Sequence, residues 1–405
     1  MYITILCKVV DNFGDIGVAW RLCRRLAKIQ SKYKICLVVD DLEAFSKIES
    51  DIIASEAKQS ININGIEIFP WNDDAFCHEV FSQNDGERLS LILELFQCGR
   101  PDWMEHILFE EKLNRTVQII MIDYLTAEKY AENFHCLQSL TRSAKVQKVN
   151  FMPGFTQKTG GLVIDDEWQE IPEYKADGPV LVFTYENDWS KLAESLIDYC
   201  GSPSTPLRAR KKVLLAQGRG KESMLQALKQ VVEPVGPERN RMDETTFVEE
   251  LPYLNQNQWD KMMKECSALV IRGEESMSRA CLSGIPFIWH AYPQSDEYQL
   301  VKVKALLERM RQHFEQADFE IVEKAWLDIN GANNMSFPDL TRESRHNCDV
   351  QIVGSSPTMT QNVYSQFFEA VPRLVPGFRD FAASLRKNGD LAYNLMTYIE
   401  KLAII

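Results

Sequence analysis

The stretch that decides the fold is CKVVDNFGDIGVAWRLCRRLA, residues 7–27. It begins at the end of a short apolar run, residues 2–10, whose length and composition are typical of a buried strand. A helical spacing of apolar residues then starts near Gly17. Residues 11–15 are therefore predicted to form the turn at the carboxyl end of the first strand, where open α/β sheets place their ligands.

The same alternation continues along the 405 residues, with apolar runs of strand length between amphipathic stretches of helical length. This pattern is typical of parallel sheets flanked by helices. A charged segment, residues 165–178, contains Pro172, is followed by Pro179 and separates the two halves. We predict an α/β protein with two doubly wound, Rossmann-like domains, residues 1–170 and 178–374, the second containing a loop or partly disordered insertion at 331–362. Strands are expected at 34–39, 117–124, 178–183, 212–216, 268–271 and 286–290, and helices at 189–198, 221–232 and 275–283.

Composition excludes several classes of protein. The 45 Lys and Arg against 58 Asp and Glu give a net charge of −13, so a broad electrostatic attraction to nucleic acid is not expected. The ten cysteines form no C-x-x-C pair and the six histidines show no metal-ligand spacing, so we expect neither a metal site nor a cofactor. The first ten residues read as a strand, so we expect no secretory leader, and no apolar run in the sequence is long enough to span a membrane. We therefore expect a cytoplasmic monomer without a membrane partner.

The first candidate site is the turn that contains Asp11 and Asp15. Gly14 and Gly17 permit backbone conformations or close approaches that other residues resist. Two carboxylates four positions apart on a tight turn can orient a cation or act as a base. The alternative is that Asp15 caps the following helix while Asp11 is solvated, and the spacing alone leaves both interpretations open.

The second candidate site is the helix start in ALVIRGEESMSRACLSGIPFIWHAYPQ, residues 268–294. A strand leads through Arg272 and Gly273 into the first helical turn, whose free amides and dipole suit a phosphate or diphosphate. Carboxylates in that turn oppose a phosphate unless they face a sugar hydroxyl, and a surface helix with an acidic first turn is the structural alternative. An aromatic face and an amide for a nucleobase are offered by Tyr253 and Gln256 in LPYLNQNQWD, residues 251–260.

Four blocks carry a resemblance to a known family: the residue 7–27 segment, FMPGFTQKTGGL at 151–162, LPYLNQNQWD and the 268–294 segment. Together they resemble the EarP family, the protein-arginine rhamnosyltransferases that modify translation elongation factor P. The resemblance implies a GT-B glycosyltransferase fold whose last helices, about 375–405, pack back on the first domain. It also implies an inverting, metal-independent transfer of rhamnose from dTDP-β-L-rhamnose to a guanidino nitrogen of an arginine in elongation factor P.

By this resemblance Asp15 is the candidate base, Asp11 orients the acceptor and Glu274 completes the catalytic set. Two positions depart from the family pattern, because Tyr253 replaces a phenylalanine and Glu275 replaces a frequent aspartate. Two other functions stay open: another GT-B transferase or an epimerase that uses a different nucleotide sugar, and a non-enzymatic acidic module that binds a basic partner. The donor-binding residues implied are Asn12, Phe13, Gly14, Gly17, Tyr185, Tyr253, Gln256, Arg272, Gly273, Glu275, Ser276 and Gln294.

Overall fold

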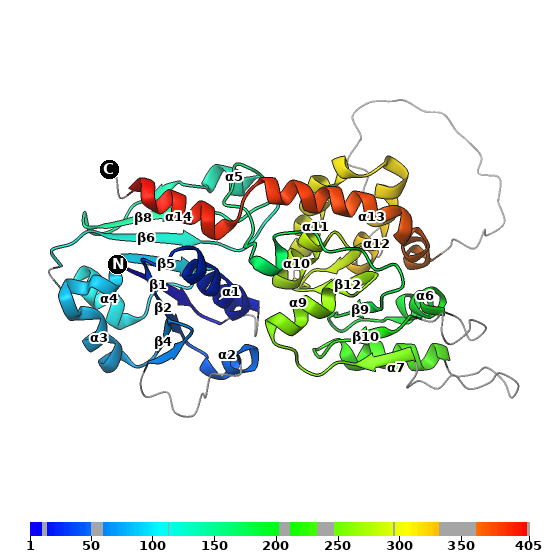
Figure 1. Ribbon diagram of the computed structural model, residues 1–405, viewed down its shortest axis with the longest axis horizontal. Helices are drawn as coiled ribbons and strands as arrows, with labels where there is room; N and C mark the ends of the chain where they lie inside the picture. Colours follow the sequence, from blue (N-terminus) through cyan, green and yellow to red (C-terminus); the bar gives the residue numbers. More distant parts are fainter. Residues whose placement is uncertain are drawn as a thin grey trace, which may run out of the picture.

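Two α/β domains lie next to each other in the computed structural model, as Figure 1 shows. It describes residues 1–9, 14–49, 60–111, 113–201, 211–232, 247–294, 296–331 and 362–402. The predicted candidates Asp11, Asn12 and Phe13 therefore lie outside the described residues, as does nearly all of the predicted 331–362 insertion. Within the described ranges, no helix is both long and apolar enough to cross a membrane.

The first domain is built on an eight-stranded sheet with the order β3-β4-β2-β1-β5-β6-β8-β7. Its central strands are parallel and almost wholly buried, as expected for apolar runs covered by helices on both faces. Its strands are β1 (Tyr2–Cys7), β2 (Lys34–Val39), β3 (Ile61–Ile63), β4 (Ile66–Pro70), β5 (Leu91–Leu95), β6 (Val117–Ile122), β7 (Gln138–Ser139) and β8 (Val146–Asn150). Its helices are α1 (Gly14–Ile29), α2 (Leu42–Ile48), α3 (Asp74–Gly86), α4 (Asp102–Phe109) and α5 (Tyr130–Phe134).

The second domain has a five-stranded parallel sheet with the order β11-β10-β9-β12-β13. The strands and helices predicted in this half are confirmed, with ends that move by only a few residues. The strands are β9 (Val180–Val182), β10 (Val213–Leu215), β11 (Val248–Glu250), β12 (Ala268–Arg272) and β13 (Phe287–His290). The helices are α6 (Ser190–Gly201), α7 (Lys221–Val232), α9 (Gln256–Lys264), α10 (Glu274–Ser283), α11 (Tyr298–Met310) and α12 (Gln316–Ile329).

The C-terminal helices connect the two domains. Helix α13 (Val363–Lys387) continues through both of its prolines for 25 residues, and its Phe378 and Leu385 lie in the core of the second domain. Helix α14 (Leu391–Leu402) instead packs Leu395 into the core of the first domain (Figure 1). The return to the first domain therefore starts after residue 387 and not near 375 as predicted, because the chain turns at Gly389, whose φ of 85° favours glycine.

Candidate active site

Each sheet has a point at which the winding of the chain reverses, and these two points face each other between the domains. In the first sheet β1 lies between β2 and β5, and in the second β9 lies between β10 and β12, so the direction of winding reverses at β1 and at β9. Open α/β sheets bind ligands outside the carboxyl ends of the strands at such points. Two cavities between the domains, of about 420 Å³ and about 450 Å³, lie there. They adjoin, because both are lined by Gly14, Tyr185, Arg219, Gly273, Glu274 and Glu275.

Asp15 lies on the wall of the 420 Å³ cavity, which we call the carboxylate cavity. Helix α1 begins at Gly14, so Asp15 stands in its first turn and not in a preceding loop as predicted. Its side chain is buried and accepts a hydrogen bond from the Tyr124 hydroxyl. The Tyr124 ring stacks on Phe96, with 4.6 Å between centroids. Burial, and then the charges of Asp15 and Glu274, raise the pKa of Tyr124, so this phenol stays protonated and donates.

Three further carboxylates line the carboxylate cavity, and one of them, Glu275, is engaged by Arg21. Asp123 follows β6 and accepts hydrogen bonds from the Tyr124 amide at 2.8 Å and from the Gln97 side chain at 2.9 Å. Glu274 opens α10 and pairs through Oε1 with Lys302 Nζ at 2.9 Å. Together with Asp15, the carboxylates of Asp123 and Glu274 suit a planar cation that donates several hydrogen bonds.

The 450 Å³ cavity, which we call the aromatic cavity, has a different lining. Phe183 and Trp259 meet edge to face at 5.2 Å, and Tyr253 is 67% exposed beside them. The Arg272 guanidinium lies 4.4 Å from the Phe183 ring centroid and 4.5 Å from that of Tyr185. Among the described residues no acceptor hydrogen-bonds Arg272 Nε, so this buried donor is available to an anion.

The first turn of α10 closes the same cavity. Gly273 precedes the helix with a φ of 73° and, as its N-cap residue, has no side chain to cap the amides that follow it. Ser276 lies in this turn and adds a hydroxyl to the cavity lining. Arg219, in the loop before α7, lines both cavities. The amides of this helix start, beside two arginines, suit an anion next to an aromatic lining.

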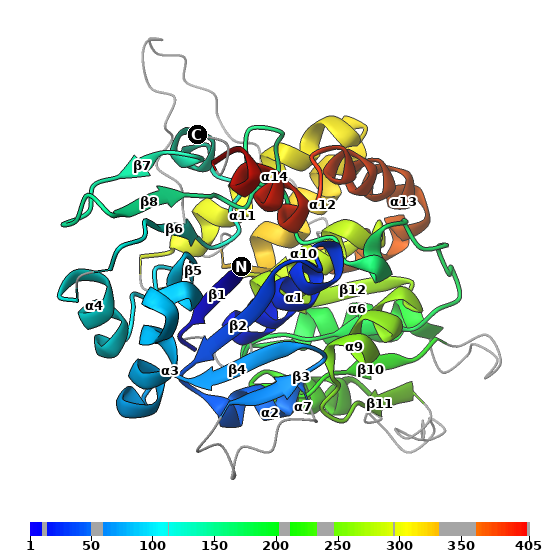
Figure 2. The same ribbon diagram turned by 60° about the vertical axis from the view of Figure 1, so that its left-hand side comes forward.

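Three residues predicted to bind the donor hold the two domains together in this structure. Glu275 Oε1 accepts from Arg21 Nε at 2.6 Å, and Arg21, only 2% exposed, also pairs with Asp260 at 2.8 Å. Gln256 Nε2 donates to the Gly17 carbonyl at 2.6 Å, and Gln256 Oε1 accepts from an arginine of α1. A Cβ at position 17 would lie 3.4 Å from Gln256 Nε2, so glycine lets the domains approach closely. Figure 2 shows α1 beside α9 and α10. The nucleotide contacts of Gly17, Gln256 and Glu275 stay predictions.

The remaining predicted residues lie around the junction of the cavities. Tyr185 is buried, and its amide donates to His290 Nδ1 at 3.3 Å. Burial, and then the Arg272 charge, lower the pKa of His290 to about 4, so the imidazole is neutral and can accept. Gln294 is exposed in the loop after β13 and lines the carboxylate cavity.

Sequence reasoning missed several residues that line these cavities, among them Asp123, Tyr124, Arg219 and Lys302. Tyr124 ends a predicted strand, so its position at a sheet edge was a usable signal. Arg219 lies in GRGKES, which lacks the phosphate-loop spacing and gave no reason to single it out. Lys302 reaches Glu274 from α11, and nothing in its local sequence distinguishes it from other surface lysines.

Comparison with known proteins agrees with this geometry. The family described as "Elongation-Factor P (EF-P) rhamnosyltransferase EarP" matches residues 3–400. A protein-arginine rhamnosyltransferase of Shewanella oneidensis is 31% identical over 75% of this chain and 79% of its own, and one of Neisseria meningitidis is 30% identical over 82% and 85%. A solved structure described as the basis for EarP-mediated arginine glycosylation of translation elongation factor EF-P covers 99% of both chains at 19% identity and a TM-score of 0.53, which confirms the predicted GT-B fold. The chain therefore belongs to the EarP family of rhamnosyltransferases and is a glycosyltransferase enzyme.

Proposed function

We propose that this enzyme transfers rhamnose from dTDP-β-L-rhamnose to a guanidino nitrogen of an arginine in translation elongation factor P. Family membership supports the reaction class. The observation that carries the proposal is the pair of adjoining cavities, one aromatic and cationic, the other lined by carboxylates. They meet at Gly273 and Glu274, where the sugar would pass from one partner to the other.

The aromatic cavity suits the nucleotide half of the donor. The thymine ring would stack against Tyr253, which lines this cavity and is largely exposed. The diphosphate would lie at the start of α10, where free amides, Ser276 and Arg272 stabilise its charge and the charge that develops as it leaves. The rhamnose would then reach Glu274, at the junction of the cavities.

The carboxylate cavity suits the arginine of the acceptor. A free guanidinium has a pKa above about 12 and is a poor nucleophile while it carries all its protons. Asp15 would take one proton as the nitrogen attacks the anomeric carbon, so that a C–N bond forms, the C–O bond to the diphosphate breaks and dTDP departs. The nitrogen attacks the anomeric carbon on the face opposite the diphosphate, which converts the β-linked donor into an α-linked product. Tyr124 holds the Asp15 carboxylate in position for this step.

The decisive experiment is intact-mass analysis of elongation factor P after incubation with this protein and dTDP-β-L-rhamnose. We expect the mass of one added deoxyhexose, with and without EDTA, and no addition with Asp15→Asn. This substitution keeps the side-chain shape, so dTDP affinity and melting temperature should stay near those of the wild type. Stronger binding of UDP or GDP than of dTDP would contradict the donor assignment. Unmodified elongation factor P would contradict the acceptor assignment.

A further inference from the structure

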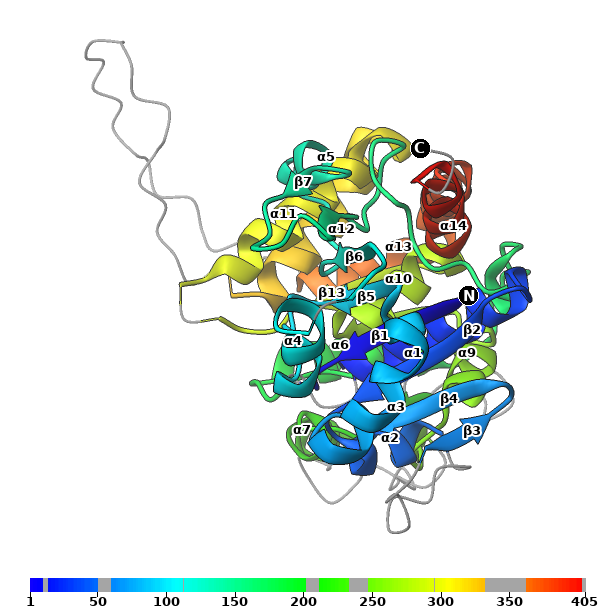
Figure 3. The same cartoon turned by 90° about the vertical axis from the view of Figure 1, so that its left-hand side faces the viewer.

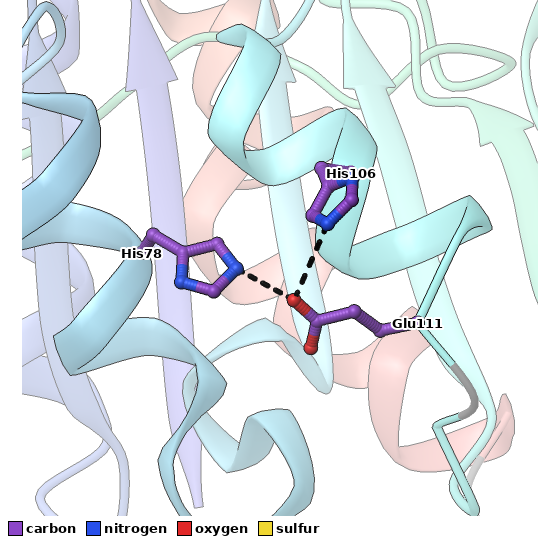
Figure 4. A group of neighbouring side chains, drawn as sticks. All are labelled: His78, His106 and Glu111. Carbon is purple, nitrogen blue, oxygen red and sulfur yellow. Dashed lines mark hydrogen bonds and ion pairs between the residues drawn. The ribbon is translucent and has the colours of Figure 1, made fainter.

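A group of potential metal ligands lies on the first domain, outside the active site. It consists of His78 on α3, His106 in the last turn of α4, and Glu111 just beyond α4. The ligand atoms of the three side chains all lie within 4.8 Å of one another, and Figure 4 shows both imidazoles directed at the Glu111 carboxylate. Figure 3, which faces the first domain, shows α3 and α4 on the side of its sheet away from α14.

The distances between these ligand atoms lie on either side of the distance that separates two ligand atoms on the same cation. His78 Nε2 lies 2.6 Å from Glu111 Oε1, and His106 Nε2 lies 3.9 Å from the same oxygen. Two atoms bound tetrahedrally to zinc at about 2.0–2.1 Å lie about 3.3 Å apart. One distance must therefore lengthen and the other shorten, each by less than about 1 Å. Because all three side chains are partly exposed, such movement meets little packing resistance, and water can supply a fourth ligand.

A second carboxylate supports the orientation of one imidazole. Glu110 Oε2 lies 2.8 Å from His106 Nδ1. When this carboxylate accepts the Nδ1 proton, the lone pair of His106 is on Nε2, the atom that faces Glu111. Histidine ligands of metals are commonly held in this way by a carboxylate on the other ring nitrogen. Hydrogen bonding alone explains the His106–Glu110 pair, but it does not explain why Nε2 faces Glu111 across 3.9 Å.

The chemistry of the ligands selects the kind of cation. Imidazole nitrogens favour zinc and similar transition metals, whereas magnesium and calcium prefer sites made only of oxygen. Glu110 and Glu111 together balance the two charges of a divalent ion. We propose that His78, His106 and Glu111 bind one divalent cation of the zinc class, which ties α3 to the end of α4. Sequence spacing predicted no such site, because only the packing of α3 against α4 brings the two histidines together.

Isothermal titration of the full-length protein with ZnCl₂ tests the proposal. We expect one site in the wild type and at least about tenfold weaker binding in His106→Ala and in Glu111→Gln. Glu110→Gln should weaken binding by about 10- to 100-fold, because it removes the carboxylate that orients the His106 ring. The control is His313→Gln, since His313 pairs with Asp380 at 2.6 Å and so offers an imidazole–carboxylate pair without a second histidine. This control should bind zinc as the wild type does.

Cobalt absorption separates this site from binding at cysteine. We expect visible bands of Co²⁺ without a thiolate charge-transfer band, and we expect His106→Ala to lose these bands while it still transfers rhamnose. Absence of a site in the wild type, wild-type affinity in both ligand variants, or a thiolate band that persists in His106→Ala would each overturn the proposal. These outcomes are independent of the transfer reaction, so failure here leaves the proposed function untouched.

Discussion

Replacement of Tyr124 by phenylalanine tests how the candidate base is positioned. The substitution removes the hydroxyl that donates to Asp15 but keeps the ring that stacks on Phe96. Because Asp15 is only 3% exposed, water replaces the lost donor poorly. A hydrogen bond to a charged group contributes about 1.5–3 kcal/mol, which corresponds to about 10- to 150-fold in a rate.

The expected effect on kcat lies near the lower end of that range. Without its donor the Asp15 carboxylate is less well positioned, which slows the transfer. The ring that remains still stacks on Phe96 and keeps the cavity wall in place, which limits the loss. We expect kcat to fall by about tenfold.

Steady-state rhamnosylation of elongation factor P, with calorimetry of dTDP, measures this effect. Affinity for dTDP should stay unchanged, because Tyr124 lines only the carboxylate cavity. The matched control is Tyr174→Phe, which removes a tyrosine hydroxyl that donates to the Ser267 carbonyl at 3.2 Å, outside both cavities. A Tyr124→Phe enzyme with kcat within about twofold of the control would refute the reasoning. So would a loss of melting temperature large enough to account for the lost rate.

Three further predictions concern the domain contact, the donor and pH. Arg21→Met leaves the carboxylates of Asp260 and Glu275 without their cationic partner, so the free energy of unfolding in urea should fall by about 3–5 kcal/mol. A loss below about 1 kcal/mol would show that water replaces the arginine. Arg272→Gln should weaken dTDP binding by at least about tenfold in calorimetry, and equal affinity would remove this arginine from the diphosphate site. His290 has a pKa of about 4 when folded and about 6.5 when unfolded, so the unfolded chain binds the proton first, and stability should be lost as pH falls from 6.5 to 4, by at most about 3 kcal/mol. His290→Gln should flatten the melting temperature over that range, and an unchanged slope would assign the loss to other groups.

The sequence predicts the elements of the fold well, and the site only in part. Apolar runs such as the one ending at Ile271 identify strands directly, and Gly273 marks the helix start that follows, so both ends of β12 could be placed. The extent of α13 could not, because its prolines suggest a break while its burial in the second domain keeps the helix continuous. Tyr124 and Lys302 come from different domains, and only the approach of those domains places them in one cavity. A local pattern carries no information about such an approach.

The same limit explains why residues predicted to bind the donor also hold α1. The first turn of α1 carries Asp15, and the next turns carry Gly17 and Arg21, whose partners Gln256 and Glu275 come from the second domain. The second domain therefore fixes the helix that carries the candidate base. Arg21 is buried, so its ion pairs with the second domain are costly to break. The position of α1, and with it that of Asp15, therefore depends on contacts that the first domain does not supply. The catalytic geometry of this cleft therefore requires contact between the two domains. Helix α1 contributes both to the carboxylate cavity and to that contact.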